Sequence, residues 1–378
     1  MAQVAKDLRS ENRVRIAELL IAEGTLSKAE INRRTGMSAP TVTRIVEELR
    51  AYGLVEEGEL SETPAVGRKP TGISLKADAV ALAGALHEGK WLQVGLMDLR
   101  GNILVSEQAQ AEGDLSSLLT AQVGGMLQEM MQRVGIAANR LAGVGVGLPA
   151  MLDPYGNCIL TAPLIGVKEK TDINAEIASL SQRLGAPVRV ENDVNAMAIG
   201  EHAGRKMGAR SDMAYIALGT GIGCGLLLRG ELRRGAHNIA GEIGYMCVDT
   251  GEEQGRLESL IGTAGLEKRF GVSLGSPLPL DAREAVVDYV ARVLAPCIVN
   301  LSAALDLSLI ALGGHLVDSL GDGLVQRLVE RAKRLAGLPL RLERGAVSLP
   351  GLYGMGMLMQ ERFLKQLRVA GLEPLLKR

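Results

Sequence analysis

Glycine-rich loops follow two apolar runs of this chain and could bind phosphate. The first loop follows residues 214–218 and contains Gly219, Thr220, Gly221 and Gly223. Glycine tolerates backbone conformations that turn successive N–H groups onto an anion, so a loop of this kind can hold a phosphate. The second cluster, Gly313 and Gly314, follows the run 305–310. Taken alone, a glycine-rich loop of this kind is more often a tight turn between two strands, so neither loop by itself indicates a phosphate site.

A second kind of chemistry is indicated by hydroxyl-bearing and basic residues near the N-terminus. A helix is expected to begin at Ser38, with Pro40 in its first turn and apolar residues along one face. The opposite face carries Thr41, Thr43 and Arg44, and we expect these side chains and Ser38 to contact DNA. Further along, residues 65–70 include Arg68 and Lys69 with no acid nearby. An extended basic segment can lie in a narrow minor groove.

The elements that would present this helix to DNA occur in the expected order. Residues 9–22 have helical spacing of apolar side chains, and Ser27 followed by Glu30 is a capping-box signature for a second, short helix. Residues 54–60 and 73–75 resemble the two strands of a wing. The order predicts a winged helix-turn-helix. The alternative is a helical protein-interaction module with a solvated basic face.

The pattern changes after residue 76 to alternating strands and helices. Residues 85–90 and 217–222 can be aligned with each other, and each lies in an expected strand–loop–strand unit. Two related units predict a two-lobed α/β domain with a cleft between the lobes, and ligands favour such clefts.

Composition excludes several classes of protein. The 378 residues are 47% hydrophobic, which excludes wholesale disorder, and the net charge of −1 requires any DNA affinity to come from a local basic patch. The four cysteines are not spaced as a disulfide framework. The N-terminal residues lack an apolar signal core, and we expect no membrane span and a cytoplasmic protein.

Four motifs together resemble the ROK family of repressors, open reading frames and kinases. They read ENDVNA at 191–196, ALGTGIG at 217–223, RGAHNIAGEIGY at 234–245 and LGG at 312–314. The resemblance covers about 300 residues and implies an actin-like, ribonuclease H-like domain of two lobes. The preceding winged helix resembles the repressor branch of the family. We therefore expect a DNA-binding domain at 1–76, a first lobe at 77–190 and a second lobe at 191–356. A C-terminal helix at about 357–378 is expected to pack on the first lobe.

The resemblance also implies a sugar pocket. Asn192 would hydrogen-bond sugar hydroxyls, and Asp193 matches the base that accepts the proton of the attacking hydroxyl in the kinases. For Asp193, a simple helix-capping turn is the alternative. Glu242 matches the first residue of the family's Glu-x-Gly-His motif, and Glu258 matches a further acceptor. Carboxylates and amides suit polyols because they accept hydrogen bonds from adjacent hydroxyls.

The chain departs from the family pattern at three places. The first phosphate loop usually reads Asp-x-Gly-x-Thr, but residues 86–90 here are Leu-His-Glu-Gly-Lys. Tyr245 replaces the His of Glu-x-Gly-His, so we expect it to contact the effector in place of that His. No cysteine occurs in the loop 249–258 that replaces the family's cysteine-rich zinc loop. Zinc needs closely spaced Cys or His ligands, so we expect no structural zinc and no other cofactor.

These departures favour a transcriptional regulator, in the repressor branch, over an enzyme. Phosphoryl transfer depends on positioned metal and phosphates, so the missing aspartate favours a pocket that binds a sugar or polyol without phosphorylating it. The alternative is an ATP-dependent sugar kinase with an added DNA-binding domain. The expected partners are a double-stranded operator with an inverted repeat and a sugar-like effector, and we expect a homodimer or homotetramer.

Overall fold

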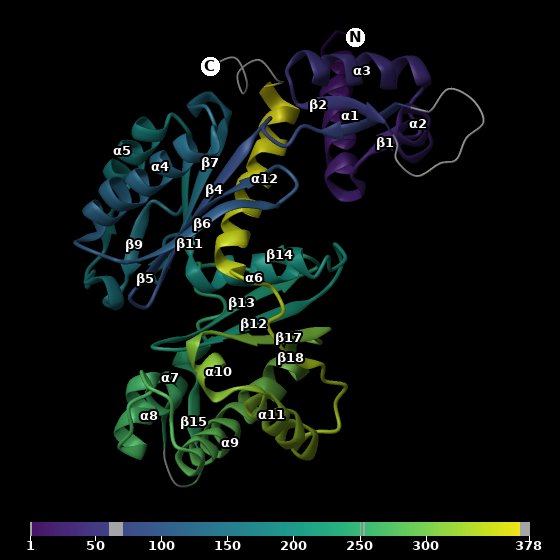
Figure 1. Cartoon of the computed structure of the whole chain (residues 1–378). Helices are drawn as coiled ribbons and strands as arrows, with labels where there is room; N and C mark the ends of the chain where they lie inside the picture. The colour runs from purple at the N-terminus through teal and green to yellow at the C-terminus, as the bar shows by residue number, and fades with distance from the viewer. Residues whose placement is uncertain (1, 60–70, 250, 252–253, 371–378) are drawn as a thin grey trace.

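The computed structural model describes residues 2–59, 71–249, 251 and 254–370. Figure 1 shows three bodies in a row: the winged helix, a first α/β lobe and a second α/β lobe. A long C-terminal helix, α12 (Pro350–Ala370), runs from the junction of the lobes to the winged helix. The architecture expected from the sequence is confirmed.

The winged helix consists of three helices and a small sheet. The helices are α1 (Ala2–Glu23), α2 (Lys28–Thr35) and α3 (Ala39–Ala51), and the strands β1 (Leu26–Ser27), β2 (Val55–Glu59) and β3 (Thr71–Leu75) pair in the order β1-β3-β2. The capping box is confirmed, because the Ser27 hydroxyl accepts from the Glu30 N–H and the Glu30 carboxylate accepts from the Ser27 N–H. Ser38 is the N-cap of α3.

The first lobe is a five-stranded sheet with helices on both faces. Its strands are β4 (Ala81–Glu88), β5 (Trp91–Asp98), β6 (Ile103–Gln110), β7 (Leu141–Leu148) and β11 (Val188–Asn192), in the order β11-β7-β4-β5-β6. Side chains alternate along β4: Ala83 and Ala85 pack toward α4 (Gly124–Val134) and α5 (Asn174–Leu184), whereas Leu82 and Leu86 pack toward α12.

Short elements complete the first lobe. They are β8 (Met151–Leu152), β9 (Cys158–Thr161) and β10 (Thr171–Asp172), which form a small separate sheet, the π-helix η1 (Ser117–Val123), and the 3-10 turns η2 (Ala138–Arg140) and η3 (Pro163–Ile165).

The second lobe repeats the sheet-and-helix arrangement. Its strands are β12 (Met213–Leu218), β13 (Ile222–Leu228), β14 (Glu231–Leu232), β17 (Leu309–Gly313) and β18 (Leu342–Arg344), in the order β14-β13-β12-β17-β18. Its helices are α7 (Leu257–Ile261), α8 (Thr263–Phe270), α9 (Leu280–Leu305), α10 (His315–Leu320) and α11 (Asp322–Leu335). The turn η4 (Ile243–Tyr245) and the hairpin β15 (Cys247–Asp249) and β16 (Gln254–Arg256) lie in this lobe. By length and composition α9 could span a membrane, but 67% of its most apolar window is buried, as in a core helix.

Two crossing helices connect the lobes. Helix α6 (Asp193–Gly204) follows β11 and packs against α12 with almost no space between the backbones. A Cβ atom added to Gly200 would lie 1.8 Å from the Pro350 carbonyl oxygen, and one added to Gly354 would lie 1.8 Å from the Ala196 oxygen. Only glycine permits this approach.

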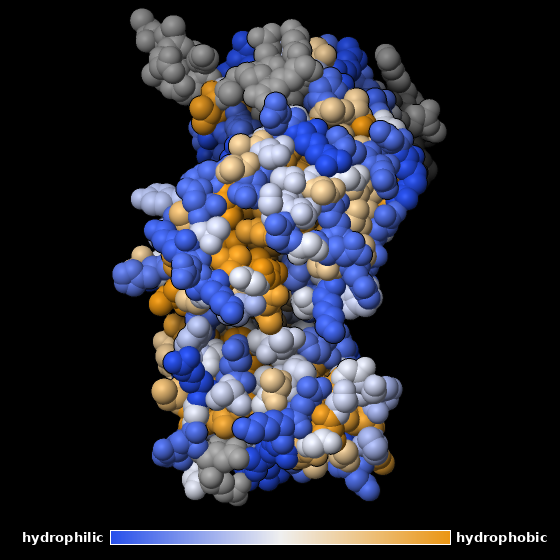
Figure 2. Space-filling view, turned by 90° about the vertical axis from the view of Figure 1, so that its left-hand side faces the viewer, coloured by the Kyte–Doolittle hydropathy of each residue, from blue (hydrophilic) through white to orange (hydrophobic). Residues whose placement is uncertain are grey.

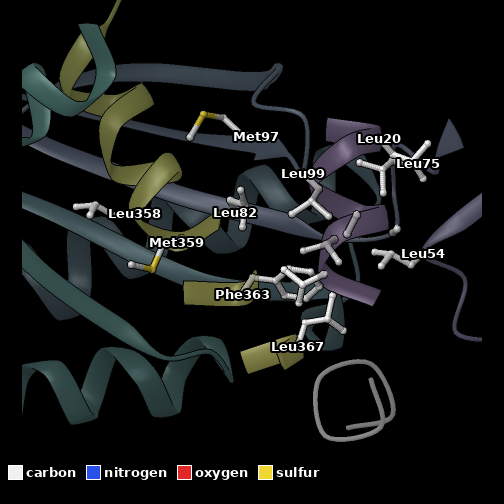
Figure 3. Packing of buried hydrophobic residues seen from close by; sticks show 14 of the residues in the cluster. Leu20, Leu54, Leu75, Leu82, Met97, Leu99, Leu358, Met359, Phe363 and Leu367 are labelled. Carbon is white, nitrogen blue, oxygen red and sulfur yellow. The ribbon is translucent and has the colours of Figure 1, made fainter. Parts of the chain in front are cut away.

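The other end of α12 contacts the winged helix. Phe363 and Leu367 lie in one buried cluster with Leu20 of α1 and with Leu54 and Leu75 beside the wing strands (Figure 3). The structure therefore places a single continuous helix between α6 and the DNA-binding domain.

The expected domain limits differ from the structure in two details. Helix α12 begins at Pro350 rather than near residue 357, because Pro350 fits the first turn of a helix. A limit at 190/191 would cut β11, which continues to Asn192 and pairs with β7 up to Leu148. Asn192 therefore belongs to a first-lobe strand, whereas Asp193 begins the connecting helix.

Candidate functional site

A cleft of about 240 Å³ lies between the two lobes and is the site that the sequence motifs indicate. The ends of β4, β7 and β11 form its first-lobe wall, and the β12–β13 loop forms much of the other wall. All the residues that the ROK resemblance assigned to the effector line this cleft: Asn192, Asp193, Glu242, Tyr245 and Glu258. In the space-filling view, the molecule narrows where the lobes meet, and hydrophobic residues gather on the first lobe above that waist (Figure 2).

Asn192 and Asp193 are positioned by the start of α6. Asn192 is the N-cap: its Oδ1 accepts from the Asn195 N–H at 2.9 Å, and its Nδ2 donates to the Ala150 carbonyl at 3.2 Å. Asp193 is the first helical residue, and its Oδ1 accepts from the Val194 N–H at 2.9 Å. Capping therefore falls mainly to Asn192, and Asp193 lines the cleft.

Below these residues, Glu191 is fully buried and paired. Arg234 donates to its two carboxylate oxygens at 2.9 and 2.5 Å, and Asn195 Nδ2 donates to it at 3.2 Å. Arg234 follows β14 of the second lobe, so the ion pair ties the two motif segments 191–196 and 234–245 together across the lobes. Asn238, in the left-handed region at φ 57°, adds a second tie by donating to the Leu152 carbonyl at 3.1 Å.

Burial disfavours the charged forms of the carboxyl groups in the cleft. It raises the pKa of Asp193 to about 8, and the nearby Glu88 and Glu242 carboxylates act in the same direction. Burial also raises the pKa of Glu242, assisted by Glu258, and burial raises the pKa of Glu88, assisted by Asp318. Like charges are thus gathered in one partly dehydrated site.

The backbone N–H groups of the glycine-rich loop are partly occupied. The Gly219 N–H donates to the Gly221 carbonyl at 3.0 Å, and the Ile222 N–H donates to the Glu258 carboxylate at 3.0 Å. His315 lies over the loop, since a Cβ added to Gly219 would be 2.7 Å from its ring. Burial lowers the pKa of His315, which favours its neutral form. The Glu258 carboxylate thus accepts a hydrogen bond from the Ile222 N–H, which a bound anion could otherwise contact.

The cleft lining also includes polar residues that the sequence analysis does not assign to a site, among them Glu88, Asn238 and His315. The segment 86–90 lacks the aspartate of the family's first phosphate loop, yet its Glu88, the last residue of β4, lines the cleft. Asn238 lies inside the motif 234–245, and His315 directly follows Gly313 and Gly314. The motifs beside these two residues are therefore the sequence signals that indicate their place in the site. Beside Glu88, His87 is buried, and its Nδ1 has no hydrogen-bond partner within the described part of the chain.

On the winged helix, the predicted DNA-facing residues lie on the solvent side of α3. Thr43 and Arg44 are exposed, whereas Val42, Ile45, Val46 and Leu49 are buried. Ser38 and Thr41 hydrogen-bond each other through their hydroxyls at 2.8 Å, so these hydroxyls are partly used in capping the helix. Arg68 and Lys69 lie outside the described residues. Glu57 of β2 pairs with Lys28 of α2 and with Arg50 near the end of α3.

Among the described residues, no group of three His, Cys, Asp or Glu side chains could hold a metal ion. Cys247 is exposed on β15 and lies across from Arg256 of β16. Since part of the loop 249–258 falls outside the described residues, the absence of structural zinc stays a prediction.

Comparison with known families agrees with this organisation. The model of the ROK family matches residues 88–341, and the model of the MarR family matches residues 10–68. The first match covers most of both lobes and includes all the residues that line the cleft, and the second covers most of the winged helix.

Individual relatives are distant in sequence. The xylose repressor of Caldicellulosiruptor bescii is 23% identical over 244 residues, which are 64% of this chain and 60% of the repressor, so the chain spans about three fifths of that relative. A solved ROK family transcriptional regulator, a homolog of the E. coli MLC protein, covers 97% of this chain with a TM-score of 0.73 and 18% identity. A ROK hexokinase from Thermus thermophilus covers 76% with a TM-score of 0.61 and 23% identity.

Proposed function

Because the chain belongs to the ROK family, we propose that it is a sugar- or polyol-responsive transcriptional repressor that binds operator DNA through its winged helix. The second and third bodies form the sensor, and the cleft between them is the effector site. The observation that carries this proposal is the convergence of the five expected effector residues on one cleft that is connected, through two packed helices, to the DNA-binding domain.

The first step of the connection is α6. Its first residue, Asp193, lines the cleft, and its middle, at Gly200, is in backbone contact with α12. A ligand that moves Asp193 must move α6, because the helix is rigid over twelve residues. Backbone contact without side chains between the helices leaves little room for α6 to slide without carrying α12 with it.

The second step is α12 against the winged helix. Phe363 and Leu367 of α12 are buried with Leu20 of α1, and Arg140 of the first lobe reaches the Tyr52 and Ala79 carbonyls at 3.4 Å. Closure of the cleft is therefore expected to change the orientation of the winged helix. A ligand changes operator affinity only through its different affinities for the two closure states.

The proposed partners follow from this arrangement. A winged helix that reads one half-site needs a second copy to read an inverted repeat, so we propose a homodimer or homotetramer that works on DNA in the cytoplasm. Lobe closure would then alter the spacing of two paired α3 helices. The exposed Arg44 and Thr43, together with the half-buried Thr41, are the base- and phosphate-contacting candidates on α3.

A sugar kinase is the alternative, and two features of the cleft disfavour it. The segment 86–90 lacks the metal-holding aspartate of the kinases' first phosphate loop, and burial lowers the pKa of His87 within this segment, which disfavours its charged form. The Glu258 carboxylate accepts from the Ile222 N–H in the other phosphate loop. A fixed negative charge at this amide opposes a triphosphate. We therefore propose binding without phosphoryl transfer.

The test uses the full chain and an operator obtained by selection from random duplexes. Operator affinity is measured with and without each sugar of a panel, and ADP release is measured with ATP and the same sugars. We expect at least one sugar to change operator affinity roughly 5–150-fold, and no ADP release above background. Asp193→Ala is expected to abolish the response, and Arg44→Ala is expected to weaken operator binding while sugar binding persists. ADP release that depends on Asp193 would instead establish the kinase.

A further inference from the structure

We propose that the cleft selects a polyol that carries a positive charge, namely an amino sugar or aminocyclitol with a free amine, over neutral and anionic sugars. The inference rests on the proposed function, since it assumes that the cleft is the effector site. It concerns the charge of the cleft walls, which the family resemblance alone does not determine.

The described residues that line the cleft include acidic side chains but no lysine or arginine that could balance their charge. The acidic side chains are those of four residues, Glu88, Asp193, Glu242 and Glu258. His315 adds no fixed positive charge, because burial favours its neutral form. Carboxyl groups of a sugar site accept hydrogen bonds from hydroxyls, but four of them gathered without a counter-charge also favour a cation, because a bound cation stabilises the ionised forms that burial disfavours.

Cations near the cleft are already engaged with other groups. Arg234 is bound to the buried Glu191 carboxylate through two hydrogen bonds. Arg256 lies over the Tyr245 ring at 5.0 Å, with its own side chain outside the cleft lining. In the adjoining cavity, Arg344 pairs with Asp318 at 2.6 Å and with Asp322 at 3.2 Å. None of these guanidinium groups has an ion-pair contact with a carboxylate of the cleft in the described structure.

Glu88 distinguishes this cleft from a pocket built only for neutral sugars. Asp193, Glu242 and Glu258 lie at positions where the ROK pattern carries acceptors for hydroxyls, but Glu88 lies in the altered first loop, at the end of β4. Its side chain has no hydrogen-bond or ion-pair partner among the described residues, and the charges of Asp318 and Glu88, and those of Glu88 and Asp193, oppose each other. An ammonium group of the ligand would satisfy it, whereas a hydroxyl would only partly do so.

The same charges reject anionic ligands. A phosphate or uronate carboxylate in a space of about 240 Å³ would lie within a few ångströms of at least one carboxylate, with no lining arginine or lysine to offset the repulsion. The Ile222 N–H, one of the loop amides that could help, is used by Glu258. Sugar phosphates are therefore excluded from the effector class, and free amines are favoured.

The experiment compares sugars that differ at one group. Glucose and glucosamine, galactose and galactosamine, and mannose and mannosamine form amine–hydroxyl pairs, and N-acetylglucosamine and glucosamine 6-phosphate test the neutralised amine and the added anion. Dissociation constants from titration calorimetry with the full chain at pH 7 are the readout. We expect at least one amine to bind about tenfold or more tightly than its hydroxyl partner, a preference that salt weakens. Acetylation and phosphorylation are each expected to remove it.

Glu88→Gln tests the source of the preference. It keeps the size and polarity of the side chain and removes its charge, so the ratio of hydroxyl to amine dissociation constants is expected to fall to about threefold or less. Glu129→Gln changes an exposed carboxylate of α4 outside the cleft and is expected to keep the ratio.

The outcomes separate this inference from the proposed function. The amine and hydroxyl sugars of every pair that binds could have equal affinity while a sugar still changes operator affinity. This result would overturn the proposed charge preference but not the proposed repressor function. Binding of glucosamine 6-phosphate as tight as glucosamine would also overturn it. If no sugar changes either the calorimetric signal or operator affinity, both proposals fail.

Discussion

The Arg234 guanidinium donates hydrogen bonds at 2.9 and 2.5 Å to the two carboxylate oxygens of Glu191, a residue that is 1% exposed. Glu191 belongs to β11 of the first lobe and Arg234 to the segment after β14 of the second. This pair lies directly behind the cleft residues Asn192 and Asp193. It is the kind of paired, hydrogen-bonded charge that can be buried without a large net cost to the fold, provided that both partners stay in place.

Arg234→Ala is therefore expected to destabilise the protein and to impair effector binding. Removing the arginine leaves the buried Glu191 carboxylate with the Asn192 and Asn195 amides and with the Arg189 guanidinium at 3.8 Å, which costs about 3 kcal/mol in the free energy of unfolding. Urea denaturation measures this change, and calorimetry measures the effector affinity. Arg233→Ala, at the neighbouring exposed position, is the control and is expected to change stability by less than about 0.5 kcal/mol. Equal stability of the two variants would contradict a structural role for the pair.

The sequence contains local signals for much of this fold but not for the contacts across it. Ser27 with Glu30 and Ser38 with Pro40 located the starts of α2 and α3, because helix caps depend on residues within one turn of each other. The motif segments located Asn192, Asp193, Glu242, Tyr245 and Glu258 in one cleft. By contrast, Glu191 and Arg234 are far apart in the chain, and no spacing rule indicates that they pair.

The same reason explains the other differences. The segment 86–90 departs from the family pattern, so that pattern assigns Glu88 no role, and its cleft position depends on how the two lobes lie against each other. The crossing of α6 and α12 depends on Gly200 and Gly354, which look like weak points of a helix until a second backbone is seen against each of them.

Asp193 makes the stability of the ligand-free protein depend on pH. Its pKa is about 8 in the folded protein, against 3.8 for an ordinary Asp, because burial and the Glu88 and Glu242 carboxylates oppose its ionisation. The folded state therefore holds a proton that the unfolded chain releases, so this group's contribution to stability falls as the pH rises from about 4 to about 8.

Asp193→Asn is thus expected to stabilise the protein relative to wild type, and more at pH 8 than at pH 5. The difference between the two pH values should be up to about 3 kcal/mol in the free energy of unfolding. Glu88 and Glu242 remain in both proteins, so the comparison isolates Asp193. Glu129→Gln is the control and should show the same effect at both pH values. A gain for Asp193→Asn that is larger at pH 5 would reverse the assignment.

The glycine crossing of α6 and α12 is expected to tolerate no side chain. In Gly354→Ala the new Cβ would lie 1.8 Å from the Ala196 carbonyl oxygen, so the helices must separate, at a cost of about 3 kcal/mol. In the control Gly323→Ala, a Cβ in α11 meets nothing within 4 Å, and alanine should stabilise that helix by about 0.5–1 kcal/mol. Thermal and urea unfolding measure both. A loss of stability in Gly354→Ala together with a gain in Gly323→Ala would support the close helix crossing. Small and equal changes in the two variants would contradict it.

Phe363 tests whether the contact of α12 with α1 transmits the effector signal. The residue is 1% exposed and lies beside Leu20 and Leu367 (Figure 3). Phe363→Ala leaves a cavity there and should cost about 3–5 kcal/mol, and Phe363→Leu should cost less. The control Leu328→Ala makes a cavity of similar cost inside the second lobe, remote from the winged helix. The measurement is the ratio of operator dissociation constants with and without the panel sugar that acts most strongly on the wild type.

Both Phe363 variants are expected to bind that sugar normally but to lose most of the ratio, because a loosened contact lets α12 move without reorienting α1. Leu328→Ala should keep the ratio despite its lower stability. Phe363→Leu is the decisive variant, since its milder cost keeps the winged helix folded and operator binding without sugar can be verified directly. If Phe363→Leu and Leu328→Ala both retain the wild-type ratio, the signal reaches the DNA-binding domain through the segment that joins β3 to β4 instead of through α12.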